Sequence, residues 1–235
     1  MLSANQIKYF KSLHLKKNRD TEGVFIAEGD KLLGDLLKSE FDCVSLFQID
    51  PNFESAEKVS PKEMSRISAL KNHSNSFGVF KKKSWGLDLN ADKVICLDGV
   101  QDPGNFGTIL RLMDWFGIEQ MICSKDTVDV YNPKVIQSTM GSLRNISVCY
   151  GDLDTMLSND FRSHVKLGAF MEGEDIKTFQ APDKFVLVMG SEGKGVREDI
   201  QKLIDSKVSI PKMPNAQAES LNVAVSCGLL MHRLI

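Results

Sequence analysis

The stretch Phe185–Asp199, FVLVMGSEGKGVRED, joins an apolar run to a glycine-rich loop. The five residues Phe185–Met189 are all apolar, which is typical of a strand that is buried on both faces of a parallel sheet. Three glycines follow within six residues, and glycine lets a ligand approach the backbone closely. Since ligands bind where the strands of an α/β sheet end, we predict that a binding loop begins at Gly190.

Two familiar phosphate-binding loops do not fit this stretch. A Walker A loop has four residues between its glycines and then Lys-Ser/Thr, whereas two residues separate Gly190 from Gly193 and Gly195 follows Lys194. A Rossmann fingerprint needs a further glycine, which is missing after Gly195. Phosphate cradling is therefore disfavoured, and the loop taken alone fits a tight strand-to-helix turn equally well.

Apolar runs alternate with helical stretches throughout residues 93–235. This alternation predicts the α/β class, with a parallel sheet covered by helices on both faces. The predicted strands are Val94–Leu97, Gln120–Cys123, Ile146–Cys149, Val165–Phe170, Phe185–Met189 and Val208–Ile210.

Residues 1–80 differ from residues 93–235 in their predicted helices and strands, and they are predicted to form a smaller domain. A polar linker over 81–92 joins it to a second domain over 93–235. Helical spacing predicts helices over 5–18 and Lys31–Leu37. The predicted strands of this domain are Val24–Ala27, Cys43–Phe47 and Ser76–Phe80.

A third helix of this domain is predicted to start near Ser60. Ser60 is a good N-cap, Pro61 suits the first helical position, and Glu63 can complete a capping box.

A second candidate loop follows the strand Val94–Leu97. The turn residues Asp102–Asn105 lead into an apolar helix that carries Arg111 less than two turns after Asn105, so both side chains could address one point. The alternative is that Asn105 only caps the helix and Arg111 is an ordinary surface residue.

A third candidate loop runs from Ile210 to Asn222, and Pro211 and Pro214 stiffen its start. Ser220 is the expected N-cap of the last helix, which leaves the polar Asn222 unexplained. That helix is expected to bury the apolar residues Leu221, Val223, Val225, Leu229 and Leu230.

The composition describes a protein with a substantial core and a net charge of −2 over 235 residues. Five scattered cysteines with no CxxC pair predict reduced thiols in the cytoplasm and argue against a zinc site. The polar N-terminus does not resemble a signal peptide, and no run approaches the about 20 apolar residues of a membrane span.

The first 19 residues carry five basic side chains and no acidic one. This local patch is compatible with an RNA-docking surface or with an ordinary solvated face. The basic side chains are Lys8, Lys11, Lys16, Lys17 and Arg19.

Three motifs together carry a resemblance to a known family. They are Asn105-Phe106-Gly107 with Arg111, then Gly190-Ser191-Glu192-Gly193-Lys194-Gly195, then Ile210-Pro211 followed by Ser220-Leu221-Asn222-Val223. In this order and spacing the chain resembles the SpoU-type (TrmH-like) RNA ribose 2′-O-methyltransferases of the SPOUT superfamily. The stretches Lys16–Arg19 and Phe25–Gly29 resemble the N-terminal ribosomal-protein-like RNA-binding domain that many members carry.

The resemblance implies an S-adenosyl-L-methionine-dependent enzyme with a deep trefoil knot in the C-terminal domain, acting on RNA as a homodimer. The residues that it implies as catalytic are Asn105, Arg111, Glu192, Ser220 and Asn222. Those implied to bind the cofactor are Met189, Gly190, Ile210, Ser220 and Leu221, and those implied to bind RNA are Lys16, Lys17 and Arg19.

Methyl transfer requires a ribose hydroxyl to be positioned and assisted in losing its proton. A guanidinium group hardly gives up its own proton, so we expect Arg111 to contact a phosphate more than to act as a base. Ribosomal RNA is the expected substrate, with transfer RNA, or a non-catalytic RNA-binding role, as alternatives. Residues 212–219 exceed the length of this loop in many relatives, so their contacts stay open.

Overall fold

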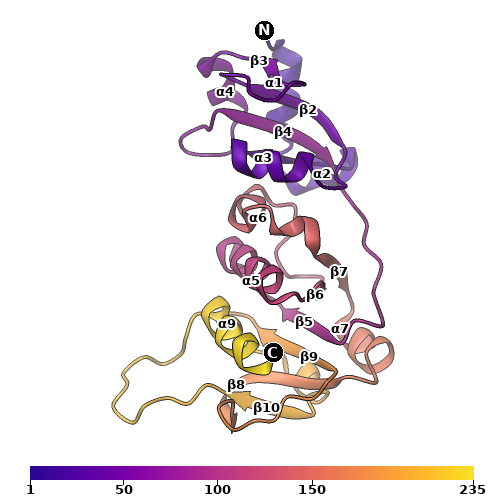
Figure 1. Cartoon of the computed structure of the whole chain (residues 1–235), viewed down its shortest axis with the longest axis vertical. Helices are drawn as coiled ribbons and strands as arrows, with labels where there is room; N and C mark the ends of the chain where they lie inside the picture. The colour runs from indigo at the N-terminus through magenta and orange to yellow at the C-terminus, as the bar shows by residue number, and fades with distance from the viewer. The chain divides into compact units, whose positions relative to one another are not determined.

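The computed structural model describes all 235 residues, which form two compact units. The first unit comprises residues 1–84 and 129–144, and the second comprises residues 85–128 and 145–235 (Figure 1). No helix combines the length and the apolar character that crossing a bilayer would need.

The first unit contains a four-stranded sheet of order β1-β4-β2-β3. Strand β4 runs antiparallel to β1 and β2, while β2 and β3 are parallel. The strands are β1 (Val24–Glu28), β2 (Cys43–Gln48), β3 (Glu57–Lys58) and β4 (Ser76–Lys81). The helices are α1 (Ala4–Ser12), α2 (Lys16–Glu22), α3 (Asp30–Leu37) and α4 (Pro61–Ile67).

The single helix predicted over residues 5–18 is wrong, because the chain breaks between α1 and α2. Leu15 adopts an extended conformation, and Leu13 is fully buried. The Arg19 guanidinium donates hydrogen bonds to the carbonyl oxygens of Leu13 (3.0 Å) and His14 (2.9 Å). The break is stable because these carbonyls find partners outside a helix.

The capping box predicted at the start of α4 is confirmed. The Ser60 hydroxyl accepts a hydrogen bond from the Glu63 backbone N–H at 3.3 Å. The Glu63 carboxylate in turn accepts one from the Ser60 backbone N–H at 2.9 Å.

A segment from the second half of the chain packs within the first unit. It contains α6 (Pro133–Thr139), and its Tyr131 ring lies 4.8 Å from the Phe25 ring between centroids. The Tyr131 hydroxyl donates to the Lys83 carbonyl oxygen at 3.0 Å. The domain boundaries proposed from the sequence stay a prediction, but the packing of residues 129–144 does not follow the order of the chain.

The second unit contains a six-stranded, entirely parallel sheet of order β10-β8-β9-β5-β6-β7. The predicted α/β class is therefore confirmed, whereas the trefoil knot stays a prediction. The strands are β5 (Lys93–Asp98), β6 (Gln120–Ser124), β7 (Ser147–Gly151), β8 (Val165–Asp175), β9 (Phe185–Gly190) and β10 (Ser206–Ser209).

The helices and turns of this unit cover both faces of the sheet (Figure 1). The central strands β5 and β9 are almost wholly buried, as their continuous apolar sequences predicted. The helices are α5 (Pro103–Phe116), α7 (Leu153–Thr155), α8 (Glu198–Gln201) and α9 (Val223–Leu234), with a π-helical turn over Met156–Asp160. A 3-10 turn over Ser142–Asn145 begins in the first unit and ends at the first residue of the second.

Helix α9 buries a different set of apolar residues from the one that the sequence predicted, namely Ala224, Cys227, Leu230, Met231 and Leu234. Leu230 is 1% exposed, but Leu221, Val225 and Leu229 are 48%, 53% and 46% exposed. Only one side of α9 packs against the unit, where its Gly228 lies beside Leu112 of α5. On the other side, Val225 and Leu229 face solvent in the isolated chain.

Candidate active site

Three loops meet at the carboxyl end of the parallel sheet in the second unit. Strands β5 and β9 are direct neighbours, with Asp98 in register with Gly190, so the loops that follow them leave the sheet side by side. The third loop follows β10 and leads into α9. The edge of the sheet therefore gathers all three motifs found in the sequence.

A hydrogen-bonded network links one polar side chain from each loop. The Asn105 side-chain nitrogen donates to Glu192 at 2.9 Å, and its side-chain oxygen accepts from the Asn222 side-chain nitrogen at 2.8 Å. Three residues far apart in sequence thus hold one another in a fixed arrangement.

Glu192 also joins the loop after β9 to the backbone after β5. Its carboxylate accepts hydrogen bonds from the backbone N–H groups of Gln101 (3.3 Å) and Asp102 (3.2 Å). Partial burial raises the pKa of Glu192, but the hydrogen bonds from Asn105, Gln101 and Asp102 outweigh it and leave the pKa below its usual value. The carboxylate is therefore an ionised acceptor at neutral pH.

The helix caps differ from the sequence predictions. Asp102, not Asn105, caps α5, accepting from the Asn105 backbone N–H at 2.8 Å. Asn222, not Ser220, caps α9, accepting from the backbone N–H groups of Ala224 (2.9 Å) and Val225 (3.2 Å). Asn105 is consequently free to use its whole side chain in the network, and Asn222 serves both the cap and the network.

A pocket of about 780 Å³ opens beside this network. All five residues predicted to bind the cofactor line it, namely Met189, Gly190, Ile210, Ser220 and Leu221. Glu192 and Asn222 of the network also line it. The structure thus brings the whole predicted cofactor set and three of the predicted catalytic residues, Glu192, Ser220 and Asn222, to one cavity, whereas Asn105 and Arg111 do not line it.

The wall also contains residues that the sequence did not predict to bind the cofactor. Phe170 and Met171 come from β8, and Ser226 and Leu230 come from α9. The place of β8 beside β9 in the sheet brings the first two there, and no local motif marks them. For Phe170 and Met171, the one available signal in the sequence was their position at the end of a predicted strand.

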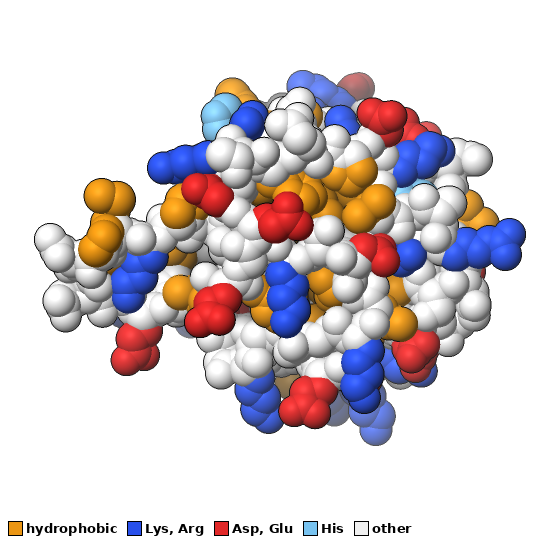
Figure 2. Space-filling view, turned by 90° about the horizontal axis from the view of Figure 1, so that it is seen from below, with side chains coloured by type: hydrophobic (Ala, Val, Ile, Leu, Met, Phe, Trp, Pro, Cys, Tyr) orange, Lys and Arg blue, Asp and Glu red, His pale blue; other side chains and the backbone are white.

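The segment from Pro211 to Asn222 forms the outer side of the pocket and is exposed at every residue. Figure 2 shows it as a lobe that projects from the face seen from below and carries both hydrophobic and charged side chains. It includes the loop 212–219, whose contacts the sequence left open.

Arg111 does not join the network. Its side chain is exposed and makes no hydrogen bond or ion pair within the chain. Six residues of helix turn the chain through about 600°, so Arg111 lies about 240° around α5 from Asn105. The two side chains therefore leave α5 in different directions, and their convergence on one point stays a prediction.

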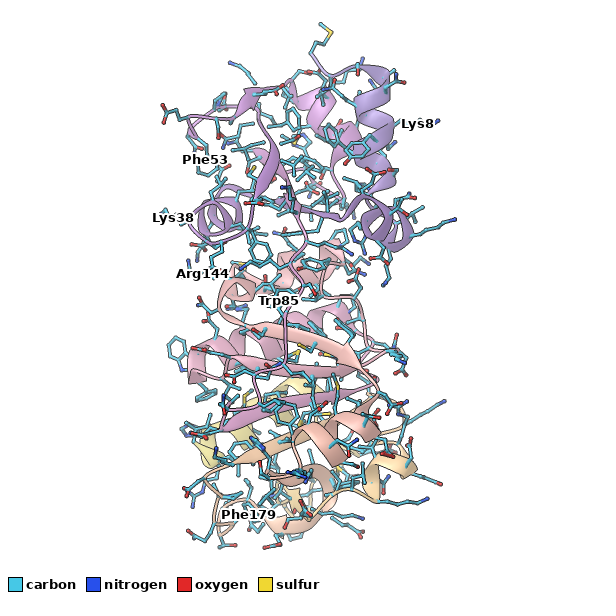
Figure 3. The ribbon with its side chains drawn as sticks, turned by 90° about the vertical axis from the view of Figure 1, so that its right-hand side faces the viewer. Lys8, Lys38, Phe53, Trp85, Arg144 and Phe179 are labelled. Carbon is cyan, nitrogen blue, oxygen red and sulfur yellow. The ribbon has the colours of Figure 1, made fainter.

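The residues predicted to bind RNA lie in the first unit, where they differ in accessibility. Lys16 is exposed and pairs with Asp20 at 2.7 Å, while Lys17 is exposed and unpaired. Lys8 of α1 points outward from the same unit (Figure 3). These lysines are accessible to a ligand.

The assignment of Arg19 to RNA binding needs correction. Its side chain is 2% exposed and pairs with Asp129 at 2.6 Å. Because the guanidinium is enclosed and engaged, it holds the first unit together and has no face left for a phosphate.

Comparison with known proteins places this arrangement in a family. The model of the SpoU rRNA Methylase family matches residues 92–232, which contain all three loops. The chain belongs to this family. A second model, the MRM3-like substrate binding domain, matches residues 4–78 of this SpoU-family chain.

Individual relatives of this SpoU-family chain match over nearly its whole length. A 23S rRNA (guanosine(2553)-2′-O)-methyltransferase, RlmP from Bacillus subtilis, is 29% identical over 97% of this chain and 95% of its own. The structure of a TrmH-family protein from Porphyromonas gingivalis has a TM-score of 0.88 at 32% identity, covering 100% of this chain and 98% of that one. An AdoMet-bound rRNA methyltransferase from Sinorhizobium meliloti has a TM-score of 0.87 at 25% identity, covering 100% and 96%.

Proposed function

We propose that this SpoU-family chain transfers the methyl group of S-adenosyl-L-methionine to a ribose 2′-hydroxyl of structured RNA, with ribosomal RNA as the substrate. The observation that carries the proposal is the network of Asn105, Glu192 and Asn222 beside the pocket. The reaction of the Bacillus relative and the AdoMet bound to the Sinorhizobium relative support it. The proposed substrate implies the cytoplasm as the compartment.

The pocket suits the cofactor in size and in chemistry. Its wall is mainly apolar, with a smaller number of polar groups, as small-molecule sites generally are. Met189, Ile210 and Leu221 supply apolar surface, while Gly190 and Ser220 offer backbone and hydroxyl groups. The bound cofactor would supply an electrophilic methyl group on a sulfonium.

Asn105 and Asn222 are well suited to orient the ribose. Each side-chain amide has two N–H donors, and each spends one within the network. One donor therefore remains on each asparagine for a substrate oxygen. Glu192 keeps Asn105 in place, so the remaining donors are fixed before the substrate arrives.

Arg111 is proposed to bind an RNA phosphate close to the reacting ribose. Its guanidinium is exposed and unpaired, so the chain provides a free positive charge there. Guanidinium groups pair with phosphate oxygens in a bidentate manner and stay protonated in proteins. We assign the phosphate contact to Arg111 and do not assign it the role of general base.

The exposed apolar side of α5 and α9 supports a homodimer. Trp115 is 83% exposed, and Val225 and Leu229 are about half exposed on the neighbouring helix. Exposed apolar surface of this kind is typical of a protein interface, and an isologous contact would pair it with its own copy. Trp115 lies one helical turn from Arg111, so the dimer would form close to the catalytic residues.

The first unit is proposed to dock the RNA through Lys16 and Lys17. Both are exposed, and the match of residues 4–78 to a substrate binding domain supports this role. Phosphate contacts by lysine give affinity without sequence preference.

The decisive experiment is methyl transfer from labelled S-adenosyl-L-methionine to ribosomal and transfer RNA, followed by mapping of the ribose methylation. Label on ribosomal RNA, lost when the target nucleotide is replaced by its 2′-deoxy form, is the expected result. Label on transfer RNA alone would change the substrate. RNA binding without any transfer would make the chain a non-catalytic RNA-binding protein.

A further inference from the structure

A buried ion pair anchors the glycine-rich loop at its far end. The Asp98 carboxylate at the end of β5 has a side chain with 0% exposure. It accepts hydrogen bonds from the Arg197 Nε at 2.6 Å and from the Arg197 backbone N–H at 2.7 Å. No other donor contacts the Asp98 side chain, so Arg197 alone satisfies a fully buried charge.

The loop between Gly190 and Arg197 is closed upon itself. Ser191 and Gly195 exchange two backbone hydrogen bonds of 3.0 Å. A Cβ on Gly190 would lie 2.1 Å from the Gly195 carbonyl carbon, so the two ends of the loop touch. Such a loop moves as one body, and the contacts at its base fix where that body lies.

Val196 and Arg197, which directly follow the loop, are held by contacts of different chemistry. Val196 is 3% exposed and belongs to the apolar core of the unit, whereas Arg197 is held by Asp98 and its side chain is 46% exposed. The core contact of Val196 does not involve the guanidinium. The ion pair between Asp98 and Arg197 is therefore a separate contact, which can set the position of the Gly190–Gly195 loop.

We propose that Asp98 and Arg197 are a positioning pair that holds the Gly190–Gly195 loop in the conformation that receives the cofactor. The inference rests on the proposed function, because five residues of this loop line the pocket. Neither Asp98 nor Arg197 lines the pocket itself, so the pair acts through the loop.

The physical reason is the cost of an unpaired buried charge. Without the guanidinium, the Asp98 carboxylate keeps a single donor, the Arg197 backbone N–H, and a carboxylate that is buried in the wild-type fold loses its countercharge, which is unfavourable. The loop can relieve this cost by moving away from β5 and admitting water. The binding-competent conformation then becomes less populated, and the apparent Kd of the cofactor rises in proportion.

The test is calorimetric titration of the full chain with S-adenosyl-L-methionine and with S-adenosylhomocysteine. We expect Arg197→Ala to raise the Kd of both by about tenfold or more, and Arg197→Lys, which retains a cation, to restore part of the affinity. The Kd for RNA should stay within about twofold of the wild-type value. Thermal unfolding verifies that each variant is folded at the temperature of titration.

Lys194→Ala is the matched control. It removes one positive charge from the same loop, but its side chain makes no hydrogen bond or ion pair within the chain and does not line the pocket. We expect the Kd of the cofactor to be unchanged in this variant. An equal loss of affinity in Lys194→Ala would assign the effect to net charge and overturn the proposal.

The double variant Asp98→Asn with Arg197→Ala tests whether the loss of cofactor affinity comes from the buried charge of Asp98 or from the missing contact of Arg197. Because the asparagine is neutral, the loop no longer has a charge to expose, and the double variant should bind the cofactor more tightly than Arg197→Ala alone. An Arg197→Ala variant that binds with the wild-type Kd would refute the positioning role. Failure of the wild-type chain to bind either compound would instead refute the proposed function.

Discussion

The Asn222 side chain donates a hydrogen bond of 2.8 Å to the side-chain oxygen of Asn105, which lies 117 residues earlier in the chain. With its own side-chain oxygen, Asn222 caps α9. One residue therefore fixes the start of a helix and ties that helix to the loop after β5. Since the two contacts use different atoms, a substitution can separate them.

Asn222→Asp should lower activity while leaving stability unchanged. Aspartate caps helices as well as asparagine, but a carboxylate cannot donate to Asn105. We expect kcat to fall about tenfold or more, with the free energy of unfolding within about 0.5 kcal/mol of wild type. Asn222→Ala should lose about 1 kcal/mol in addition. Urea unfolding and methyl transfer on the same preparations check both, and normal turnover of the aspartate variant would remove the Asn105 contact from the mechanism.

Arg111→Ala should abolish methyl transfer and keep the fold. The side chain has no partner in the chain, and exposed substitutions of this kind change stability by about 0.5 kcal/mol or less. Thermal unfolding and single-turnover methyl transfer measure the two effects. Near-normal turnover would take Arg111 off the list of catalytic residues.

The double substitution of Lys16 and Lys17 by alanine should weaken RNA binding and leave the cofactor Kd unchanged. Lys17 should contribute more than Lys16, because Lys16 already pairs with Asp20. The slope of log K against log salt should become shallower by about 1.4–1.8 if both lysines contact phosphates. The matched control is the double alanine variant of Lys58 and Lys62, which are also exposed lysines of the first unit. Equal RNA affinity of the two double variants would argue against the docking role.

Arg19→Met should destabilise the protein instead of weakening RNA binding. The substitution leaves Asp129 with a mostly buried carboxylate that has no countercharge, and breaking such a pair costs about 3–5 kcal/mol. Chemical denaturation measures the loss, and RNA titration of the folded fraction provides the second readout. A stable variant with weakened RNA binding would return Arg19 to the RNA-binding surface.

The stabilising contribution of Glu192 should depend on pH. Its pKa in the folded chain lies below its usual value of 4.5, so ionisation favours folding above that value, and the contribution disappears as pH falls through the folded pKa. Wild type should therefore exceed Glu192→Gln in unfolding free energy at pH 7 and lose this advantage in acid. Denaturation curves of both proteins between pH 7 and pH 3 test the sign, and a constant difference across this range would contradict it.

Local patterns predicted most of the secondary structure. The apolar runs of the second unit became six parallel strands, because a strand covered on both faces must be apolar along its length. The capping box at Ser60 formed as expected, since all of its hydrogen bonds lie within four residues. The glycine-rich motif was correctly predicted to begin where a strand ends, at Gly190, because the apolar run before it is also a local pattern.

The cap of α9 shows where local patterns were insufficient. Ser220 and Asn222 are both good capping residues, and only the contact with Asn105 distinguishes them. The exposure of Val225 and Leu229 likewise follows from which side of α9 meets α5. Arg19 became a core residue because Asp129, 110 residues away, provides its countercharge.

The sequence by itself determined the elements, the class of fold and the motifs, because hydrophobic periodicity and capping chemistry act between residues close along the chain. The tertiary structure decided which side chains meet and which are buried. It joined Asn105, Glu192 and Asn222, enclosed Arg19 and paired Asp98 with Arg197. These contacts depend on packing between distant elements, and burial and pairing are properties of that packing.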